Sequence, residues 1–398
     1  MQTRLTLRPG QRGTKRLARR FGDRLVWLDE PVLRGRVKSA GGRWDPRPRV
    51  WALSYGAVRL ASHTMLKSLG VVAALALAQG ALAQGGVSYP AMTNEGFDHM
   101  AGTYGFYIGQ AYSVEALAER FPDLRGRLSR AQASFDAEFA ASVRNIDAIL
   151  TAESRTWPNG AREELTEAVR SQLDLSTITR ADADAFAEEV ERRASGEIPS
   201  PYLETFLIYR PDFFERPAEE FFRAYRKTFR TGDHPKSKGV DFQVEYPISW
   251  ASAEGRRPNV IAMFTSENGR GLETVSLIVI ELPVDAAELE GATGQEMLDA
   301  ELLQMFVPSS GRVLSAVPIR LDRLEGGKLT FTLEERYLDQ TVMGRTAAYA
   351  VLYQNKLIVI QGSVGGVAQV GGDVEARFEK FAPLFDQIAN SLVVQSQW

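Results

Sequence analysis

The hydrophobic positions change their period along the chain, and that change predicts two kinds of structure. From Thr93 to about Thr231 they recur every three or four residues, as on one face of an α-helix. After Gly239 they alternate with polar residues, as in half-buried strands. The clearest helical stripe follows Pro122 and consists of Leu128, Ala131, Phe135, Phe139, Val143, Ile146 and Leu150.

Capping and breaking residues divide the helical part. Thr179 and Asp182 form a predicted capping pair, and Gly196 closes the helix that they start. Four prolines then limit the chain to short helices: Pro199, Pro201, Pro211 and Pro217. The last predicted helix of this part places four aromatic residues on one side: Phe221, Phe222, Tyr225 and Phe229.

The second part predicts an antiparallel sheet with a few helices. Val240 to Tyr246 alternates as a strand, and further strands are expected at 259–264, 272–282, 312–321, 328–337, 341–353 and 357–364, with a turn at 267–271. Thr293 and Glu296 predict a capping box for one inserted helix, and Pro383 should kink or restart the closing helix. The predicted class is α+β: a helical domain at 88–231, a linker at 232–239 and an antiparallel domain at 240–396.

The sheet part resembles a known fold. The opening Phe242-x-Val-x-Tyr-Pro247-x-x-Trp250 and the closing Phe381-x-x-x-Phe385-x-x-Ile388-x-Asn-Ser-Leu392 are similar to the PsbP-like fold, that of extrinsic photosystem II subunits and a Ran-binding import factor. The resemblance covers roughly 239–394 and involves mostly packing residues. It implies a binding or assembly factor and no catalytic residue. The helical half resembles no known family.

A segment near the start predicts export. Met65 is followed by Lys67, an apolar run from Leu69 to Leu82, and a small-x-small site that ends at Ala83 before Gln84. That order is typical of a cleavable signal peptide at 65–83, and the run is too short for a membrane span. The alternative is a core helix, but such a helix should carry polar residues at helical spacing.

Residues 1–64 contain 15 Lys and Arg against 4 Asp and Glu, without a sustained period. They are predicted to be disordered and to lie outside the native protein, with translation starting at Met65. The alternative is a basic arm that binds nucleic acid, which would lie in a different compartment from an export signal.

The charge of the mature chain, which follows the predicted cleavage after Ala83, limits the classes of partner. Its net charge is about −15, which disfavours binding to nucleic acid and to anionic membranes. The absence of cysteine excludes disulfides, thiolate nucleophiles and lipid attachment after the cleavage site. We therefore expect a secreted or periplasmic protein with no permanent membrane anchor.

The sequence contains no motif that indicates a catalytic, metal or nucleotide site. The two histidines of the mature chain, His99 and His234, lack a metal-binding spacing, so no metal is expected. Gly362-Ser363-Val364-Gly365 lacks the first glycine of a nucleophile elbow, and no nucleotide cradle occurs, so no cofactor is expected either. A pair of carboxylates that meet only in the fold remains open.

One basic stretch stands out from the acidic background: Arg223, Arg226, Lys227, Arg230, His234, Lys236 and Lys238. It can complement a helix C-terminus and hold two acidic domains together through ion pairs. It can also form a docking surface for a protein or a small anionic ligand.

Three functions remain. The first is an exported, non-enzymatic binding or assembly protein of unknown ligand. The second is an envelope hydrolase that uses an acidic pair in an interdomain cleft. The third is a structural envelope component that forms oligomers and binds no ligand.

Overall fold

The computed structural model describes four short strands within 19–54, and then 94–153, 157, 160, 162–172, 177–283, 289–299, 303, 307–337, 340–367 and 374–398. The chain divides into two compact units, Met1–Val72 and Ala73–Trp398. The predicted signal peptide at 65–83 and its cleavage site at Ala83 and Gln84 lie outside the described residues.

The described strands of the first unit form a small antiparallel sheet. They are β1 (Arg19–Phe21), β2 (Arg24–Leu28), β3 (Arg43–Asp45) and β4 (Val50–Ser54), in the order β1-β2-β4-β3. These strands differ from the predicted disorder. Their segments contain Trp and Val, which favour strands, but they are too short for a period to show among the arginines. A translation start at Met65 stays a prediction.

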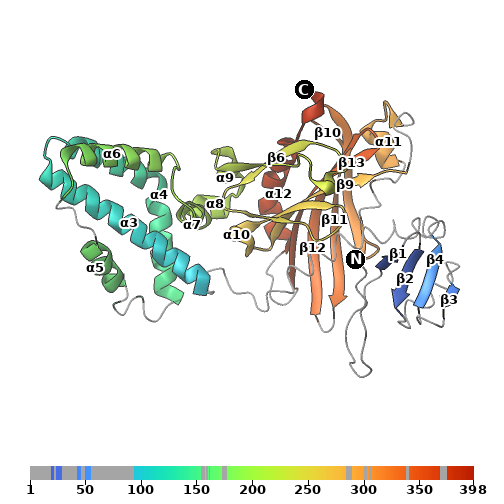
Figure 1. Ribbon diagram of the computed structural model, residues 1–398, viewed down its shortest axis with the longest axis horizontal. Helices are drawn as coiled ribbons and strands as arrows, with labels where there is room; N and C mark the ends of the chain where they lie inside the picture. Colours follow the sequence, from blue (N-terminus) through green and yellow to red (C-terminus); the bar gives the residue numbers. More distant parts are fainter. Residues whose placement is uncertain are drawn as a thin grey trace, which may run out of the picture. The chain divides into compact units, whose positions relative to one another are not determined.

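The second unit begins with helices, as the sequence predicts. Their bounds are α3 (Asn94–Arg120), α4 (Arg125–Glu153), α5 (Arg162–Gln172), α6 (Arg180–Ala194), α7 (Tyr202–Ile208), α8 (Pro211–Glu215) and α9 (Ala218–Phe222). All seven residues of the predicted stripe on α4 are buried in one apolar core with α3, α6, α7 and α8. Figure 1 shows α3, α4 and α6 side by side. The capping box of Thr179 and Asp182 is confirmed, and Gly196 follows α6 in a left-handed conformation.

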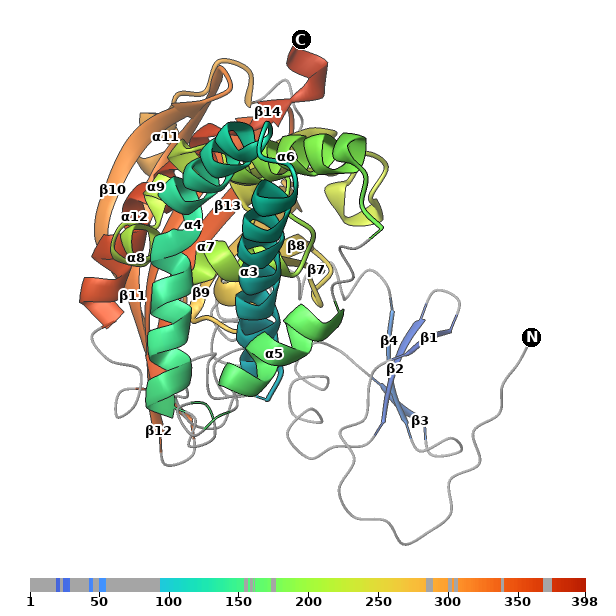
Figure 2. The same ribbon diagram turned by 90° about the vertical axis from the view of Figure 1, so that its left-hand side faces the viewer.

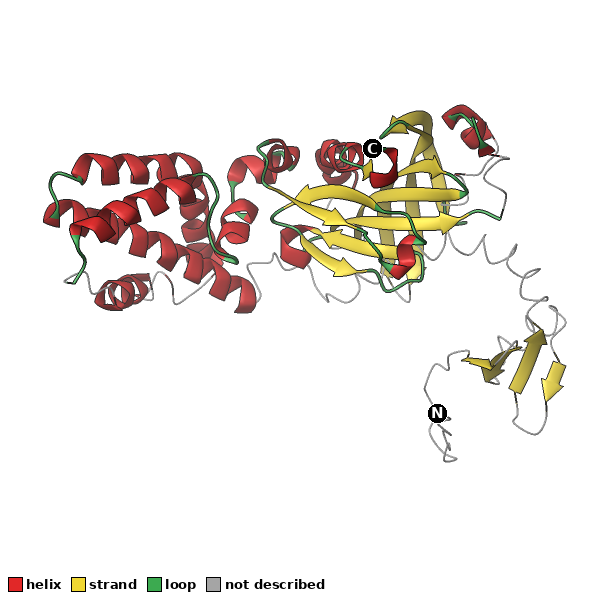
Figure 3. Cartoon of the chain, turned by 45° about the horizontal axis from the view of Figure 1, so that its top comes forward, coloured by secondary structure: helices red, strands yellow, loops and turns green. Residues whose placement is uncertain are grey.

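Strands follow, and they form two sheets among the described residues. The strands are β5 (Arg226–Arg230), β6 (Phe242–Pro247), β7 (Ala251–Glu254), β8 (Val260–Thr265), β9 (Glu273–Glu281), β10 (Gly311–Leu321), β11 (Leu324–Tyr337), β12 (Gln340–Tyr353), β13 (Lys356–Val367) and β14 (Val393–Val394). One sheet has the order β10-β11-β12-β13-β9-β8-β7, and the other has the order β14-β6-β5. Every pair is antiparallel, so the predicted α+β class is confirmed (Figure 3).

Three further helices belong to this half in the part of the chain that the structure describes: α10 (Ser266–Gly269), α11 (Gly294–Asp299) and α12 (Val374–Asn390). Alternate residues of the central strands enter two cores, one under α12 and the smaller sheet, the other beside α11. Helix α12 packs on β12 and β13, and α11 packs on β10 and β11 (Figure 2). The capping box of Thr293 and Glu296 is confirmed, with Thr293 N donating to Glu296 Oε2 over 2.8 Å. Pro383 lies inside α12, and the helix continues through it.

One helix prediction is wrong. The aromatic spacing of Phe221, Tyr225 and Phe229 predicted a helix, but α9 ends at Phe222 and residues 226–230 form β5, which pairs with β6. Ala224 adopts a left-handed conformation (φ 65°) that ends the helix, and pairing with β6 decides the strand. The predicted linker at 232–239 therefore connects β5 to β6, and the sheet half starts before it.

Candidate functional site

A half-open cavity of about 170 Å³ lies where the short helices meet the sheet half. Five parts of the chain line it: α7, α8 with α9, the turn after β6, the loop between β8 and β9, and α12. Its wall is mostly apolar and aromatic, and consists of Leu207, Ile208, Phe213, Phe214, Pro217, Trp250 and Phe381. Its polar groups are Glu220, Ser249, Ser266, Glu267, Arg377 and Lys380. An apolar pocket with a few convergent polar groups is the usual form of a small-molecule site.

Glu220 comes from α9 and is only 5% exposed. Ser249 donates to it twice, from its backbone N–H over 2.9 Å and from its hydroxyl over 2.6 Å. Burial raises the pKa of Glu220 to about 7, although these hydrogen bonds and the charge of Lys227 oppose that rise. Both oxygens of Glu220 thus hold the turn after β6 in place.

Glu273 begins β9 and is completely buried. Its Oε2 accepts a hydrogen bond from the Ser266 hydroxyl over 2.6 Å, and its Oε1 accepts one from Arg377 Nε over 2.8 Å. Arg377 Nη2 also donates to the same Oε1. The ion pair therefore joins α12 to the loop between β8 and β9, and it fixes the guanidinium at the cavity wall.

The loop between β8 and β9, which contains the short α10, carries backbone strain. Glu267 and Asn268 both adopt left-handed conformations, with φ of 53° and 52°, which cost about 1–2 kcal/mol per non-glycine residue. The loop is fixed by a hydrogen bond from Asn268 N to Ser249 O over 2.7 Å. Gly271 cannot be replaced without movement, because a Cβ there would lie 1.8 Å from Ser266 Oγ. Strain of this kind is concentrated at binding and catalytic sites.

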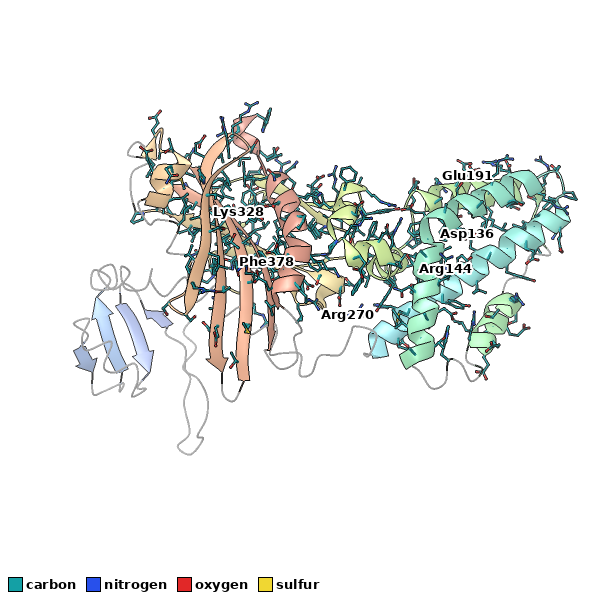
Figure 4. The ribbon with its side chains drawn as sticks, turned by 180° about the vertical axis from the view of Figure 1, so that it is seen from behind. Asp136, Arg144, Glu191, Arg270, Lys328 and Phe378 are labelled. Carbon is teal, nitrogen blue, oxygen red and sulfur yellow. The ribbon has the colours of Figure 1, made fainter. Side chains whose placement is uncertain are left out.

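Glu267 differs from the other two glutamates. Among the described residues its carboxylate has neither a hydrogen bond nor an ion pair. The pKa of Glu267 is raised to about 7, mainly by burial and also by the negative charge of Glu273. The charges of Glu267 and of Arg270 act on Tyr209 at the end of α7, which places this loop beside the helical half. Figure 4 labels Arg270 on the α10 side of the sheet half.

The cationic side of the cavity belongs to α12. Lys380 Nζ lies 3.8 Å from the centre of the Phe214 ring, and no ion pair joins Lys380 to a described carboxylate. Burial lowers the pKa of Lys380. Phe214 is 46% exposed, so the ring and the ammonium stand at the mouth of the cavity.

No residue of the predicted basic stretch lines this cavity, and most of its cations are paired within the chain. Arg223 lies 3.3 Å from Asp212, Arg226 lies 3.2 Å from Glu245, Lys227 lies 3.2 Å from Glu204, Arg230 lies 2.6 Å from Asp241, and Lys236 lies 2.8 Å from Glu254. His234 Nδ1 accepts a hydrogen bond from Lys236 N over 3.2 Å. Lys238 forms no ion pair with the residues that the structure describes, and burial lowers its pKa. A docking role for these residues stays a prediction.

The sequence predicted an acidic pair in a cleft but did not identify the residues that form it. The sequence does contain a signal for one buried carboxylate at the cavity. Glu273 occupies the same period-two face of its strand as three buried residues, Val275, Leu277 and Val279. A carboxylate on an inward face indicates a buried polar site. No signal pointed to Glu267, because its loop only indicated a turn.

Two negative findings apply to the described part of the chain. No group of three or more His, Asp or Glu side chains there is arranged to hold a metal ion. No helix among those residues is long and apolar enough to cross a membrane.

No family model matches the chain, and no curated protein matches it. Among solved structures, the Ran-binding protein Mog1p of Saccharomyces cerevisiae matches 44% of this chain and 98% of its own, at 14% identity and a TM-score of 0.29. LpqN, involved in cell envelope biogenesis of Mycobacterium tuberculosis, matches 45% and 96%, at 10% identity and a TM-score of 0.26. A Bacteroides thetaiotaomicron protein matches 39% of this chain at 10% identity and a TM-score of 0.24, and this chain spans 45% of its length. Scores this low carry no argument about function.

Proposed function

We propose that the mature chain is an exported, non-enzymatic binding protein whose small ligand occupies the cavity between α7–α9, the loop of Glu267 and α12. The observation that carries the proposal is the cavity itself, with an aromatic wall and a carboxylate that no described residue satisfies. Export rests on the sequence from Met65 to Ala83. A PsbP-like sheet half belongs to the same proposal and rests on the sequence resemblance.

The neighbourhood of the cavity favours binding over turnover. Glu220 and Glu273 each use both carboxylate oxygens in hydrogen bonds to the protein, so they hold the walls in place. Rigid walls of this kind lower the cost of ordering when a ligand binds. The volume of about 170 Å³ is close to that of a protein cavity that accepts benzene, and the cavity is half-open, so the ligand has about six to twelve non-hydrogen atoms.

A thermal-shift screen of the full chain tests the proposal. The probes are amines, carboxylic acids, amino acids, alcohols and monosaccharides of up to about twelve non-hydrogen atoms. We expect at least one class to raise the melting temperature in the wild type. Ile208→Trp, which fills the cavity, and Phe214→Ala, which removes part of its wall, should abolish the shift.

Phe222→Ala is the matched control, because Phe222 is 77% exposed and does not line the cavity. It should leave the shift unchanged. A screen without any hit, or hits that bind equally well to Ile208→Trp, would refute the cavity as the binding site.

One observation favours a second candidate, an envelope hydrolase. Glu220 and Glu267 both line the cavity, and burial raises the pKa of each to about 7, a value suited to a general acid. Here Glu267 would donate the proton, since its carboxyl group has no described partner. Turnover of p-nitrophenyl glycosides or esters that Glu267→Gln removes would support this candidate, and no turnover by the wild type would reject it.

A further inference from the structure

The cavity presents two opposite charges that form no ion pair with any residue that the structure describes. Glu267 and Lys380 act on each other electrostatically, Arg270 and Arg377 also act on Glu267, and Glu215 also acts on Lys380, yet none of these groups lies within ion-pair distance of either of them. An ionised group in a partly buried place is costly unless a partner satisfies it. The arrangement therefore lacks two groups, one cationic beside Glu267 and one anionic beside Lys380.

The rest of the wall is apolar, so it favours a ligand with an apolar group. Phe213, Phe214 and Phe381 contribute rings, and Leu207 and Ile208 contribute branched side chains. Burying a side chain of the size of leucine or phenylalanine against such a wall contributes about 1.5–3 kcal/mol. A ligand with both charges and an apolar group fills every part of the site.

We propose that the cavity binds a small zwitterion, namely a free amino acid with an aliphatic or aromatic side chain. Its ammonium group meets the Glu267 carboxylate, its carboxylate meets Lys380 with Arg377 behind it, and its side chain lies against the rings of Phe213 and Phe381. This inference rests on the proposed binding function and names the ligand class of the same site.

The size of the cavity agrees with this class. A volume of about 170 Å³ accepts roughly the non-hydrogen atoms of leucine or phenylalanine and is too small to enclose a folded peptide or a long acyl chain. A purely cationic ligand would leave Lys380 beside a second positive charge, and a purely anionic one would meet Glu267. Each of those ligands satisfies one end of the site and opposes the other.

Binding should also release a proton. Burial and the charge of Glu273 raise the pKa of Glu267 to about 7 against the opposing charges of Arg377, Arg270 and Lys380, so the carboxyl group is mostly protonated at pH 6. An ammonium group beside it favours the ionised form and lowers that pKa. At pH 6 binding therefore releases protons, up to about one per amino acid bound.

Isothermal titration calorimetry of the full chain tests the inference, with L-leucine and L-phenylalanine as probes. The comparison ligands lack one charge each: 3-methylbutylamine and 4-methylpentanoate for leucine, phenethylamine and 3-phenylpropanoate for phenylalanine. We expect each to bind at least about tenfold more weakly than its parent amino acid, as for a site built to pair a group that the analogue lacks.

Two variants test which residue of the site binds each charged group of the ligand. Glu267→Gln should remove the advantage of leucine over 4-methylpentanoate and abolish the proton release, measured as the dependence of the binding enthalpy on buffer ionisation at pH 6. Lys380→Met should remove the advantage of leucine over 3-methylbutylamine. Glu379→Gln, on α12 and outside the cavity, is the matched control and should change neither quantity.

The outcomes separate this inference from the function that it rests on. If the singly charged analogues bind as tightly as the amino acids and still depend on Phe214, the cavity is a binding site but the zwitterion is wrong. If leucine and phenylalanine both fail to bind while another screened class binds, the zwitterion is again wrong. If no probe binds, both proposals fail.

Discussion

Replacing Glu220 by glutamine tests the electrostatics of the cavity wall without disturbing its shape. Glutamine keeps an oxygen that can accept from Ser249 N and gains an amide that can donate to the Ser249 hydroxyl. The substitution removes one buried titratable group. We expect the stability of the variant to depend less on pH than that of the wild type.

The sign follows from the direction of the pKa change. Burial raises the pKa of Glu220 from 4.5 to about 7, so the folded chain holds this proton more tightly than the unfolded chain. The resulting stabilisation is present below pH 4.5 and is lost as the pH rises through about 7. At about 1.4 kcal/mol per pKa unit, the wild type should lose about 2 to 3 kcal/mol from this group between pH 5 and pH 8.

Urea unfolding of the full chain at pH 5, 6.5 and 8, followed by fluorescence, measures the effect. The loss of unfolding free energy between pH 5 and pH 8 should be smaller in Glu220→Gln than in the wild type by about 2 kcal/mol. Ser249→Ala should lose more unfolding free energy between pH 5 and pH 8 than the wild type, because the Ser249 hydroxyl opposes the rise in the pKa of Glu220. Equal pH dependence in the wild type and both variants would refute the reasoning.

Three further predictions concern the rest of the chain. Arg210→Ala removes a residue that is only 6% exposed and that bonds Glu138 and Asp212, leaving those carboxylates only Arg223 as a cationic partner, and should destabilise the chain by about 1–3 kcal/mol in urea melts. Gly362→Ala places a Cβ 2.4 Å from the Phe385 ring and should cost about 1–3 kcal/mol; Gly344→Ala meets its nearest atom at 3.5 Å, and an equal cost there would contradict the packing argument. N-terminal sequencing of the exported product should begin at Gln84, and an intact leader would contradict the predicted cleavage.

Local patterns along the chain determined much of the fold. The stripe from Leu128 to Leu150 is buried as its spacing predicts, because residues three or four apart lie on one face of a helix whatever surrounds it. The capping boxes at Thr179 and Thr293 are formed because both partners lie within one turn. Strands β7 to β9, and likewise β10 to β13, pair with their neighbours in the chain, as their short connections indicate.

Pairing and packing between distant segments decided the rest. The spacing of Phe221, Tyr225 and Phe229 fits a helix, and only the partner strand β6 makes residues 226–230 a strand. The cavity joins Glu220 to Arg377, which lie 157 positions apart, so no local pattern places them together. Burial among those side chains raises the pKa values of Glu220 and Glu267, and burial is a property of the assembled fold.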